Sequence, residues 1–364
     1  MDPRYDRTRI FSKEDDPLGP PIRRTPPTLS PVIPVLAIDI GGTKMALALV
    51  DETGAILDQL VVPTTPSDDA EAVYAPLHSG LATLLGRHEW PDGAPDTGIG
   101  SAGPIDVHGS AAGVGGSRGS SPLLGTVSPV NISAWRDFPL VARVAASVAT
   151  TTGRAPQVRL AGDGHCIALG EHWLGAGRDV ASLIGVVIST GVGGGAVLDD
   201  RLVTGTTGNA VHLGHTSVNA WGEKCVCGGY GCVEMYARGP AMVEAARARG
   251  WTGDDGIDLT RSAANGDPVA TEVIDNGMRA AAAGIAATAT QLDIDVVVVG
   301  GGLSKAGEVI FEPLRRHLTD FATLPYVQHL DLRVAELDNA GLLGAASLAL
   351  SLSGRGSLRA ELGS

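Results

Sequence analysis

Residues 35–51 read VLAIDIGGTKMALALVD, and this stretch carries the clearest structural signal in the chain. One apolar run enters a pair of glycines and a second apolar run leaves them, which predicts two strands joined by a short turn. The same pattern returns as GVVISTGVGGGAVLDD at residues 185–200, and a further strand enters glycines in VVVVGGGLS at residues 296–304. Two such units in one chain predict two α/β lobes that face a cleft.

The composition agrees with two lobes. The chain has 364 residues, of which 44% are hydrophobic, and this is more than one hydrophobic core usually needs. Only 4% of the residues are aromatic, whereas 50 are glycine. We therefore expect packing through Ala, Val and Leu between closely spaced backbones, with glycine loops where the chain approaches a ligand.

The charge and hydropathy patterns exclude several classes of partner. The formal net charge is -13, with 40 acidic against 27 Lys and Arg residues, which opposes binding to nucleic acid. The sequence has neither an apolar run near twenty residues nor the apolar segment of a signal peptide. We expect a cytoplasmic protein that binds neither nucleic acid nor membrane.

Changes in composition and periodicity along the sequence divide the chain into segments. Residues 1–34 contain eight prolines and many charges without periodicity, so we expect a disordered leader. We expect an N-terminal α/β lobe over residues 35–160, a C-terminal α/β lobe over residues 161–350, and a short tail over residues 351–364.

The glycine turns favour a nucleotide site. Backbone N–H groups of a turn without Cβ atoms can approach a phosphate closely, and Thr43 and Thr190 add hydroxyl donors. The spacing is not that of a Walker A loop, and no GxGxxG opens a helix after the first strand, which argues against a Rossmann dehydrogenase. The expected nucleotide-binding residues are Asp39, Gly41, Gly42, Thr43, Lys44, Thr190, Gly191, Gly193, Gly194, Gly301 and Gly302.

A second feature is HLGHTSVNAWGEKCVCGGYGCVE at residues 212–234, which holds three of the four cysteines. Cys225, Cys227 and Cys232 offer sulfur ligands for Zn²⁺, and His215 offers a nitrogen that completes four ligands. A full shell leaves no position for water, so we expect a structural zinc. His212 is the alternative histidine ligand. The competing interpretation is a disulfide cluster, which a cytoplasmic setting and an odd number of clustered cysteines disfavour.

Together these motifs resemble the ROK family of bacterial sugar kinases and related repressors. The resemblance rests on DIGGTK (39–44), STGVGGG (189–195), VGGGLS (299–304) and CVCGGYGCVE (225–234), and extends to GIGSAGPID, PVNISAW and AGLLGAASLAL. It implies the actin-like ATPase (ribonuclease H-like) fold, with ATP and a sugar meeting in the cleft. It also assigns His215 as the zinc histidine. We expect ATP and Mg²⁺ as cofactors and a homodimer.

The resemblance also suggests the catalytic group. Phosphoryl transfer to a hydroxyl needs a carboxylate that accepts the proton, and the family places its catalytic aspartate at the position of Asp163. The alternative is an ordinary helix N-cap. Two interpretations of Asp39 stay open: it ends a strand, or it holds Mg²⁺ directly or through water. The role of Lys44 stays open.

For the sugar, the resemblance implies Gly103, Asn131, Asp163, His215 and Glu234 as ligands. Two positions depart from the family pattern. Sugar kinases of the family usually have Asn-Asp where this chain has Gly162-Asp163, and Glu where this chain has His212. The resemblance implies that the missing asparagine contacts the C3 hydroxyl, so the change fits a 3-amino sugar such as kanosamine. We include His212 among the sugar-contacting residues.

The expected activity is therefore ATP-dependent phosphorylation of the 6-hydroxyl of a hexose or amino-hexose. Glucokinase is the first alternative, followed by kinases of N-acetylated amino sugars. A transcriptional regulator of the same family would need a helix-turn-helix that residues 1–34 do not supply. A sugar sensor without catalysis is the third class. Cys166, within an apolar run, is expected to be a buried small hydrophobe.

Overall fold

The fold is taken from a computed structural model that describes residues 34–107 and 125–355. The expected leader, apart from residue 34, and most of the expected tail lie outside the described residues. No helix in the described part of the chain is long and apolar enough to cross a membrane.

The first sheet has five strands in the order β3-β2-β1-β4-β7. The strands β1 (Val35–Ile40) and β2 (Lys44–Val50) form the predicted antiparallel hairpin, in which Ile40 pairs with Met45. The strand β3 (Ile56–Pro63) extends this hairpin, whereas β4 (Thr97–Ser101) and β7 (Val158–Gly162) run parallel to β1. A separate two-stranded sheet joins β5 (Ile105–Asp106) to β6 (Thr126–Val127).

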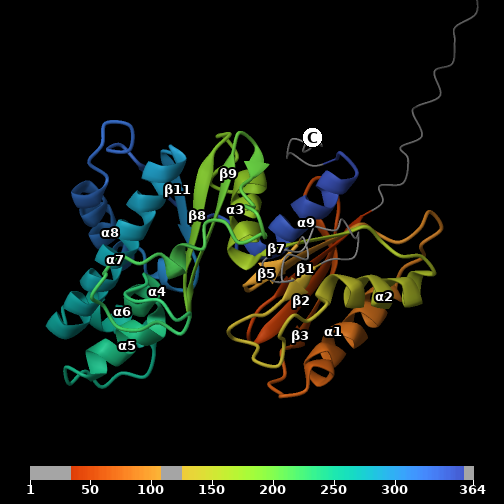
Figure 1. The fold of residues 1–364 in the computed structure, drawn as a ribbon, viewed down its shortest axis with the longest axis horizontal. Coiled ribbons are helices and arrows are strands. Elements are labelled where there is room, and N and C mark those ends of the chain that lie inside the picture. The colour runs from red at the N-terminus through yellow and green to blue at the C-terminus, as the bar shows by residue number, and fades with distance from the viewer. Residues whose placement is uncertain (1–33, 108–124, 356–364) are drawn as a thin grey trace, which may run out of the picture. The chain divides into compact units, whose positions relative to one another are not determined.

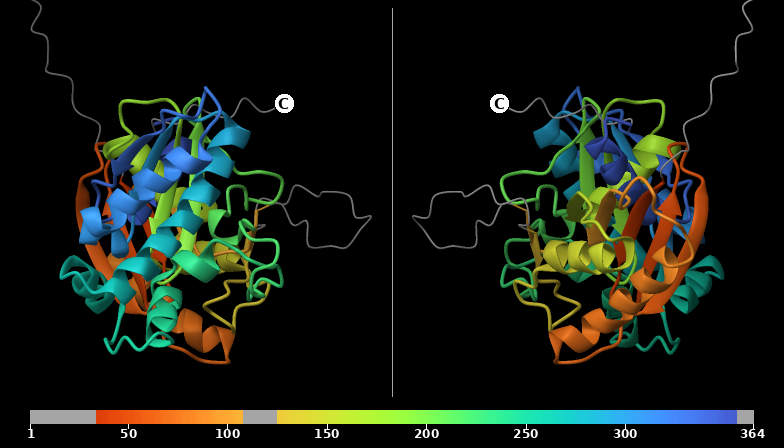
Figure 2. Two further views of the ribbon diagram at one scale, coloured as in Figure 1. Left: turned by 90° about the vertical axis from the view of Figure 1, so that its left-hand side faces the viewer. Right: turned by 90° about the vertical axis from the view of Figure 1, so that its right-hand side faces the viewer.

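Alternate residues of β1 pack into different cores, because side chains of a strand point to opposite faces. Leu36, Ile38 and Ile40 face the helices α1 (Ala70–Leu85) and α2 (Leu140–Thr152). Val35 and Ala37 face the last helix, α9 (Ala340–Leu352). Figure 2 shows the strands of this sheet in red and orange beside α1 and α2. The continuous apolar sequence of β1 thus reflects burial on both faces.

The second sheet repeats the plan of the first, with the strand order β10-β9-β8-β11-β12. The strands β8 (Leu183–Ile188) and β9 (Val192–Leu198) form the second predicted hairpin, which β10 (Arg201–Leu202) extends. The strands β11 (Val296–Gly300) and β12 (Asp331–Val334) continue it in parallel. The predicted α/β class with two similar units is therefore confirmed.

Helices cover both faces of the second sheet. On one face, Leu183 packs with Ala168 of α3 (Asp163–Leu174). On the other face, Ile184, Val186 and Ile188 pack with the long helix α7 and its neighbours, which Figure 1 draws in green to blue. These elements are α4 (Glu234–Ala237), α5 (Gly239–Arg247), α6 (Gly256–Ala264), α7 (Pro268–Leu292), α8 (Glu308–Phe321) and two 3₁₀ turns, η1 (Leu213–His215) and η2 (Leu303–Ala306).

Helices α3 and α9 pack closely against each other at glycines. A Cβ on Gly170 would lie 2.2 Å from the Ala340 carbonyl oxygen, and a Cβ on Gly344 would lie 1.7 Å from the Cys166 carbonyl oxygen. Only glycine allows the two backbones to approach this closely. The helix that packs on the second sheet is thereby joined to the helix that packs on the first.

The expected boundary between residues 160 and 161 stays a prediction. This position lies inside β7, and the chain returns to the first sheet at its end, because α9 packs on β1 and β4. A Cβ on Gly98 of β4 would lie 1.8 Å from the Ala345 carbonyl oxygen of α9. Residues after 339 therefore belong with the first sheet in space.

Candidate active site

Two aspartates lie near each other at the ends of β1 and β7. Asp39 is the fifth residue of β1, and Asp163 is the first residue of α3, directly after β7. Burial and the nearby Asp163 carboxylate raise the pKa of Asp39 from 3.8 to about 6, although Lys44 acts in the opposite direction. Two carboxylates held this close can bind a divalent cation, because a cation would relieve their repulsion.

The N-cap of α3 is Gly162, not Asp163, so the alternative interpretation of Asp163 as an ordinary N-cap is wrong. The Asp163 side chain is exposed, and its Oδ1 accepts a hydrogen bond of 2.7 Å from the N–H of Gly164. A Cβ on Gly193 of β9 would lie 4.0 Å from the same oxygen. The carboxylate therefore lies against the second glycine hairpin.

His165 supports this helix start and was not expected from the sequence. Its Nε2 lies 2.7 Å from the Ala210 carbonyl oxygen, and Gly162 N–H donates to its Nδ1 over 3.4 Å. The hydrogen bond from Gly162 requires an acceptor at Nδ1, so the ring is the Nε2–H tautomer that donates to Ala210. Burial lowers the pKa of His165, which keeps the ring neutral. The sequence signal was its position two residues after Asp163.

Asn209 is the second residue that sequence reasoning missed. Its side chain accepts a hydrogen bond from the Ile105 N–H (2.9 Å) and donates one to the Ile105 carbonyl oxygen (2.6 Å). It thereby fixes the segment around Gly103, whose Cβ position lies 3.4 Å from both Asn209 Oδ1 and His212 Cε1. The sequence could not predict this contact, because 104 residues separate Asn209 from Ile105.

Five of the six expected sugar-contacting residues come together around η1. The rings of His212 and His215 meet edge to face with centroids 4.9 Å apart. Desolvation lowers the pKa of His212, and the adjacent His215 lowers it further, while Asp163 and Glu234 oppose this change. Asp163, Gly103 and Glu234 thus lie in the neighbourhood of His212.

Glu234 connects this neighbourhood to the second hairpin. Its Oε2 accepts a hydrogen bond of 3.0 Å from the N–H of Val192, directly after the turn at Thr190 and Gly191. A Cβ on Gly191 would lie 3.1 Å from the same oxygen. The position of the Glu234 carboxylate is therefore tied to the position of the β8–β9 turn.

The first hairpin turn places the remaining expected ligand beside it. A Cβ on Gly42 would lie 2.7 Å from Asn131 Nδ2, so glycine is needed where the turn meets the amide. The loop of Asn131 is anchored by the buried Trp135, whose Nε1–H donates to the Ala70 carbonyl oxygen over 3.1 Å. A cavity of about 330 Å³ opens here, lined by Gly42, Thr64, Thr65, Pro66, Ser67, Asp68, Val73, Asn131, Ile132 and Ser133.

The other residues expected at phosphates fall into two groups. Thr43, Lys44 and Thr190 are exposed at the tips of the two hairpins, and Gly302 is exposed after β11. Gly194 is instead buried, and a Cβ there would lie 2.9 Å from Leu213 Cβ and 3.1 Å from the Val211 carbonyl oxygen. The close approach of β9 to the segment around η1 therefore favours glycine at this position. Gly301 adopts a positive φ of 98°, which favours glycine as the chain leaves β11.

The four expected zinc ligands form one cluster. One donor atom from each of His215, Cys225, Cys227 and Cys232 lies within 4.8 Å of the others. Cys225 Sγ is 3.6 Å from His215 Nδ1, and Cys227 Sγ is 3.6 Å from Cys232 Sγ. Tetrahedral zinc with bonds of about 2.0 to 2.3 Å holds its ligands at about such separations. The cysteines are free rather than disulfide-bonded, and the donor set fits zinc.

Two further expectations concern histidine and cysteine roles. The donor cluster includes His215 and not His212, so His215 is the histidine placed for a metal. Cys166 is fully buried in the core beside α9, and burial raises the pKa of its thiol. It is the buried small hydrophobe that the sequence predicted.

The fold and the site define an α/β protein with two glycine hairpins and paired carboxylates. Comparison with known proteins gives the family: the ROK family profile matches residues 35–351, and the chain belongs to the ROK family.

Three relatives illustrate the similarity. A glucokinase of Thermotoga maritima is 30% identical over 333 residues, which cover 87% of this chain and 98% of the relative. An N-acetylmannosamine kinase of Escherichia coli is 35% identical over 317 residues, covering 86% and 97%. The crystal structure of a ROK family glucokinase from Streptomyces griseus, in complex with glucose and AMPPNP, aligns with a TM-score of 0.69 and 31% identity, covering 86% and 98%.

Proposed function

We propose that this protein transfers a phosphoryl group from ATP to the 6-hydroxyl of a hexose or amino-hexose, with kanosamine as the best substrate. The observation that carries the proposal is the position of Asp163, whose carboxylate lies against the second glycine hairpin and near His212. The glucokinase and N-acetylmannosamine kinase relatives support an ATP-dependent sugar kinase. We also propose that the two α/β units form the actin-like ATPase fold.

Asp163 is the proposed general base. Its exposed carboxylate can reach a sugar hydroxyl from the start of α3, and a base placed there removes the proton as the oxygen attacks the γ-phosphorus. His165 and Gly162 hold the helix start in place. The sugar oxygen would then be held beside the base and in line with the γ-phosphorus that it attacks.

Asp39 and the two hairpin turns are the proposed nucleotide site. The turn N–H groups and the hydroxyls of Thr43 and Thr190 suit phosphate oxygens. Mg²⁺, when bound, would neutralise phosphate charge, and Asp39 with its raised pKa is the residue proposed to hold it, directly or through water. The glycines proposed to contribute are Gly41, Gly42, Gly191, Gly193, Gly194, Gly301 and Gly302.

The zinc cluster has a proposed structural role. Four protein ligands would fill the coordination shell, so zinc would fix the loop rather than activate a water molecule. His215 would use Nδ1 for the metal, since that atom faces Cys225 Sγ. The bound metal would also fix Glu234, which follows Cys232 by two residues.

The proposed preference for a 3-amino sugar rests on two positions. Gly162 supplies no side-chain group to the C3 substituent, which leaves room for an amine and its hydration. A neutral His212 avoids repelling an ammonium group, and its lowered pKa supports the neutral form. Gly103, Asn131, His215 and Glu234 are proposed to contact the remaining hydroxyls.

The test is a panel of sugars with ATP and the purified full-length chain. We expect phosphorylation at O6 with kcat/KM for kanosamine above that for glucose, N-acetylmannosamine and N-acetylglucosamine. Preference for glucose would make the protein a glucokinase. Sequence-specific DNA binding without turnover of any sugar would make it a regulator, and sugar binding without ATP turnover would make it a sensor. The expected homodimer and the cytoplasmic location are separate proposals, checked by light scattering and by fractionation.

A further inference from the structure

The backbone crosses between the two sheets at two places in the described residues. After β7 of the first sheet the chain enters α3, which packs on β8 and β9 of the second. After β12 of the second sheet, residues 335–339 lead to α9, which packs on β1 and β4 of the first. The two crossings therefore exchange helices between the sheets, and α3 and α9 lie against each other.

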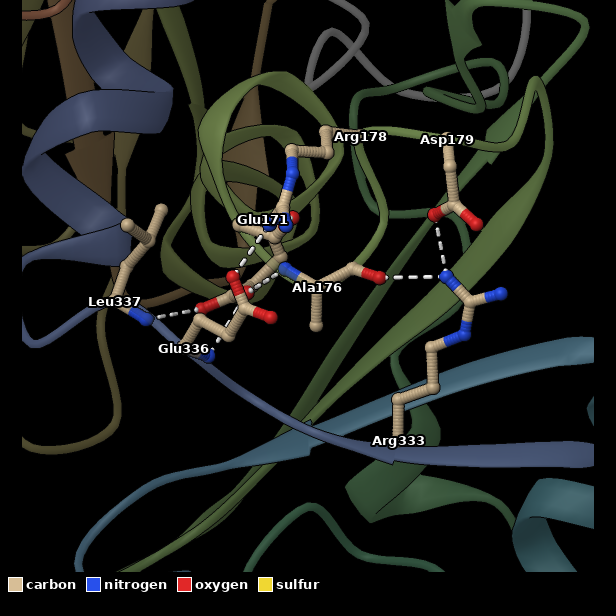
Figure 3. Close-up of polar contacts among 8 residues, drawn as sticks. Glu171, Ala176, Arg178, Asp179, Arg333, Glu336 and Leu337 are labelled. Carbon is tan, nitrogen blue, oxygen red and sulfur yellow. Dashed lines mark hydrogen bonds and ion pairs between the residues drawn. The ribbon is translucent and has the colours of Figure 1, made fainter.

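One buried carboxylate joins these two crossings. Glu171, near the end of α3, is 0% exposed. Its Oε2 accepts hydrogen bonds from the N–H groups of Ala176 (2.9 Å) and Glu336 (3.1 Å), and its Oε1 accepts one from Leu337 (3.0 Å). Figure 3 shows the carboxylate between the turn after α3 and the strand-to-helix segment that contains Glu336 and Leu337.

The turn after α3 is shaped around this carboxylate. A Cβ on Gly175 would lie only 2.0 Å from Glu171 Oε2, so a larger residue would displace the carboxylate. Burying a charge costs several kcal/mol unless hydrogen bonds compensate, and here three backbone N–H groups do so. A buried carboxylate that accepts three backbone hydrogen bonds therefore fixes the two segments to each other at this crossing point.

One crossing carries an aspartate of the site, and the other crossing contacts the second aspartate. Asp163 is the first residue of α3. Gly341, at the start of α9, lies against the other aspartate, because its Cβ position is 2.9 Å from Asp39 Oδ2. The spacing of α3 and α9 therefore affects the spacing of Asp39 and Asp163.

We infer that Glu171 is a positioning residue for phosphoryl transfer, which it supports by fixing the start of α9 to the end of α3 and so holding Asp39 and Asp163 at their working separation. This inference rests on the proposed kinase function. Glu171 is fully buried, so its effect is exerted through α3 and α9. A displacement of about 1 Å between reacting groups can lower a rate by about 100-fold. Weakening the hydrogen bonds of Glu171 should therefore lower kcat.

The test compares Glu171→Gln with wild type and with Arg178→Ala. Glutamine turns one acceptor oxygen into an NH₂ group that faces N–H donors. Arg178→Ala removes an exposed ion pair to Glu336, where Arg178 Nη1 lies 2.5 Å from Glu336 Oε2, and a hydrogen bond of 2.9 Å to the Gly175 carbonyl oxygen. It removes none of the three hydrogen bonds to the buried Glu171 carboxylate. It is therefore the matched control for a merely local loss of structure.

We expect Glu171→Gln to keep its circular dichroism spectrum and bind AMPPNP at the wild-type stoichiometry. Its kcat should fall by about 10- to 100-fold, with KM for sugar and ATP changed by less than about threefold. Arg178→Ala should keep kcat and both KM values.

Gly175→Ala perturbs the same carboxylate from the other side and should reproduce the loss of kcat. A folded Glu171→Gln protein with wild-type kcat overturns the inference. A fall in kcat that merely follows the fraction of chains binding AMPPNP, or loss of fold in both variants, makes Glu171 a folding residue and also overturns it. If wild type phosphorylates no sugar, the proposed function fails first and takes this inference with it, so the two failures are distinguishable.

Discussion

Asp39→Asn is expected to stabilise the protein while it abolishes phosphoryl transfer. Burial and the Asp163 carboxylate disfavour the charged form of Asp39, which raises its pKa from 3.8 to about 6. At neutral pH the native protein nevertheless carries this charge. Asparagine has nearly the same shape and no charge, so it removes the cost of burial and repulsion together.

The size of the effect follows from the pKa change. A rise from 3.8 to about 6 corresponds to about 3 kcal/mol of destabilisation at neutral pH, which is the upper limit of the gain from the substitution. With an unfolding entropy of about 2 cal/mol/K per residue, a fold of this size has an unfolding entropy of about 0.7 kcal/mol/K. The expected rise in Tm is therefore at most about 4 °C.

The gain should depend on pH in a defined direction. Below about pH 4 the carboxyl is protonated in both the native and the unfolded protein, so wild type and variant are equally stable there. Between about pH 4 and 6 the unfolded chain loses the proton first, and the wild type loses stability as the pH rises. Above about pH 6 the difference is constant and at its largest.

The assay is thermal unfolding at about pH 4 and pH 7.5 without added Mg²⁺, together with kcat for the preferred sugar. Asp51→Asn is the control of opposite sign, because hydrogen bonds from Thr53 and Ala55 lower the pKa of Asp51 and its charge stabilises the turn. An Asp39→Asn protein no more stable than wild type at pH 7.5, or equally stabilised at both pH values, would refute the electrostatic reasoning. Retained kcat would remove Asp39 from the site.

Four further outcomes can be checked. Asp163→Asn should fold, bind ATP and lose about 10²- to 10⁴-fold in kcat, and near wild-type turnover would exclude Asp163 as the base. Metal analysis should find about one zinc per chain, and Cys227→Ser should lower that content and increase hydrogen exchange in residues 212–234; a metal-free, fully active preparation contradicts the zinc site. Activity on a 3-amino sugar should fall as the pH drops through the lowered pKa of His212, whereas a profile unchanged in His212→Gln would assign the fall to another group. Gly162→Asn should shift kcat/KM toward glucose by about 1 kcal/mol relative to Gly162→Ala, the control for contact with His165 Nδ1 at 3.3 Å, and equal shifts in both variants would exclude the amide.

Much of the fold could be predicted because its signals are local. Strand β1, the turn at Gly41 and Gly42, and strand β2 follow each other directly, so alternating burial and turn chemistry are visible in one short window. The same holds for the second hairpin and for the cysteines at positions 225, 227 and 232, which are close enough in sequence to imply a common ligand. Asp163 was identified through the family resemblance, since an aspartate at a strand-to-helix turn has several ordinary uses.

The sequence by itself thus determined the two hairpin units, their glycine turns and the cluster of metal-ligand side chains, because each depends on residues a few positions apart. Only the tertiary structure decided which helix covers which sheet, and with it the role of Glu171, whose partners Glu336 and Leu337 are 165 and 166 residues away. A glutamate in a helix is ordinarily exposed, and nothing in its neighbouring sequence predicts burial. The exchange of α3 and α9 between the sheets supplies the physical reason, since it brings two distant N–H groups to a carboxylate that also accepts from the nearby Ala176 N–H. We infer that it also sets the spacing of Asp39 and Asp163 through backbones that meet at glycines.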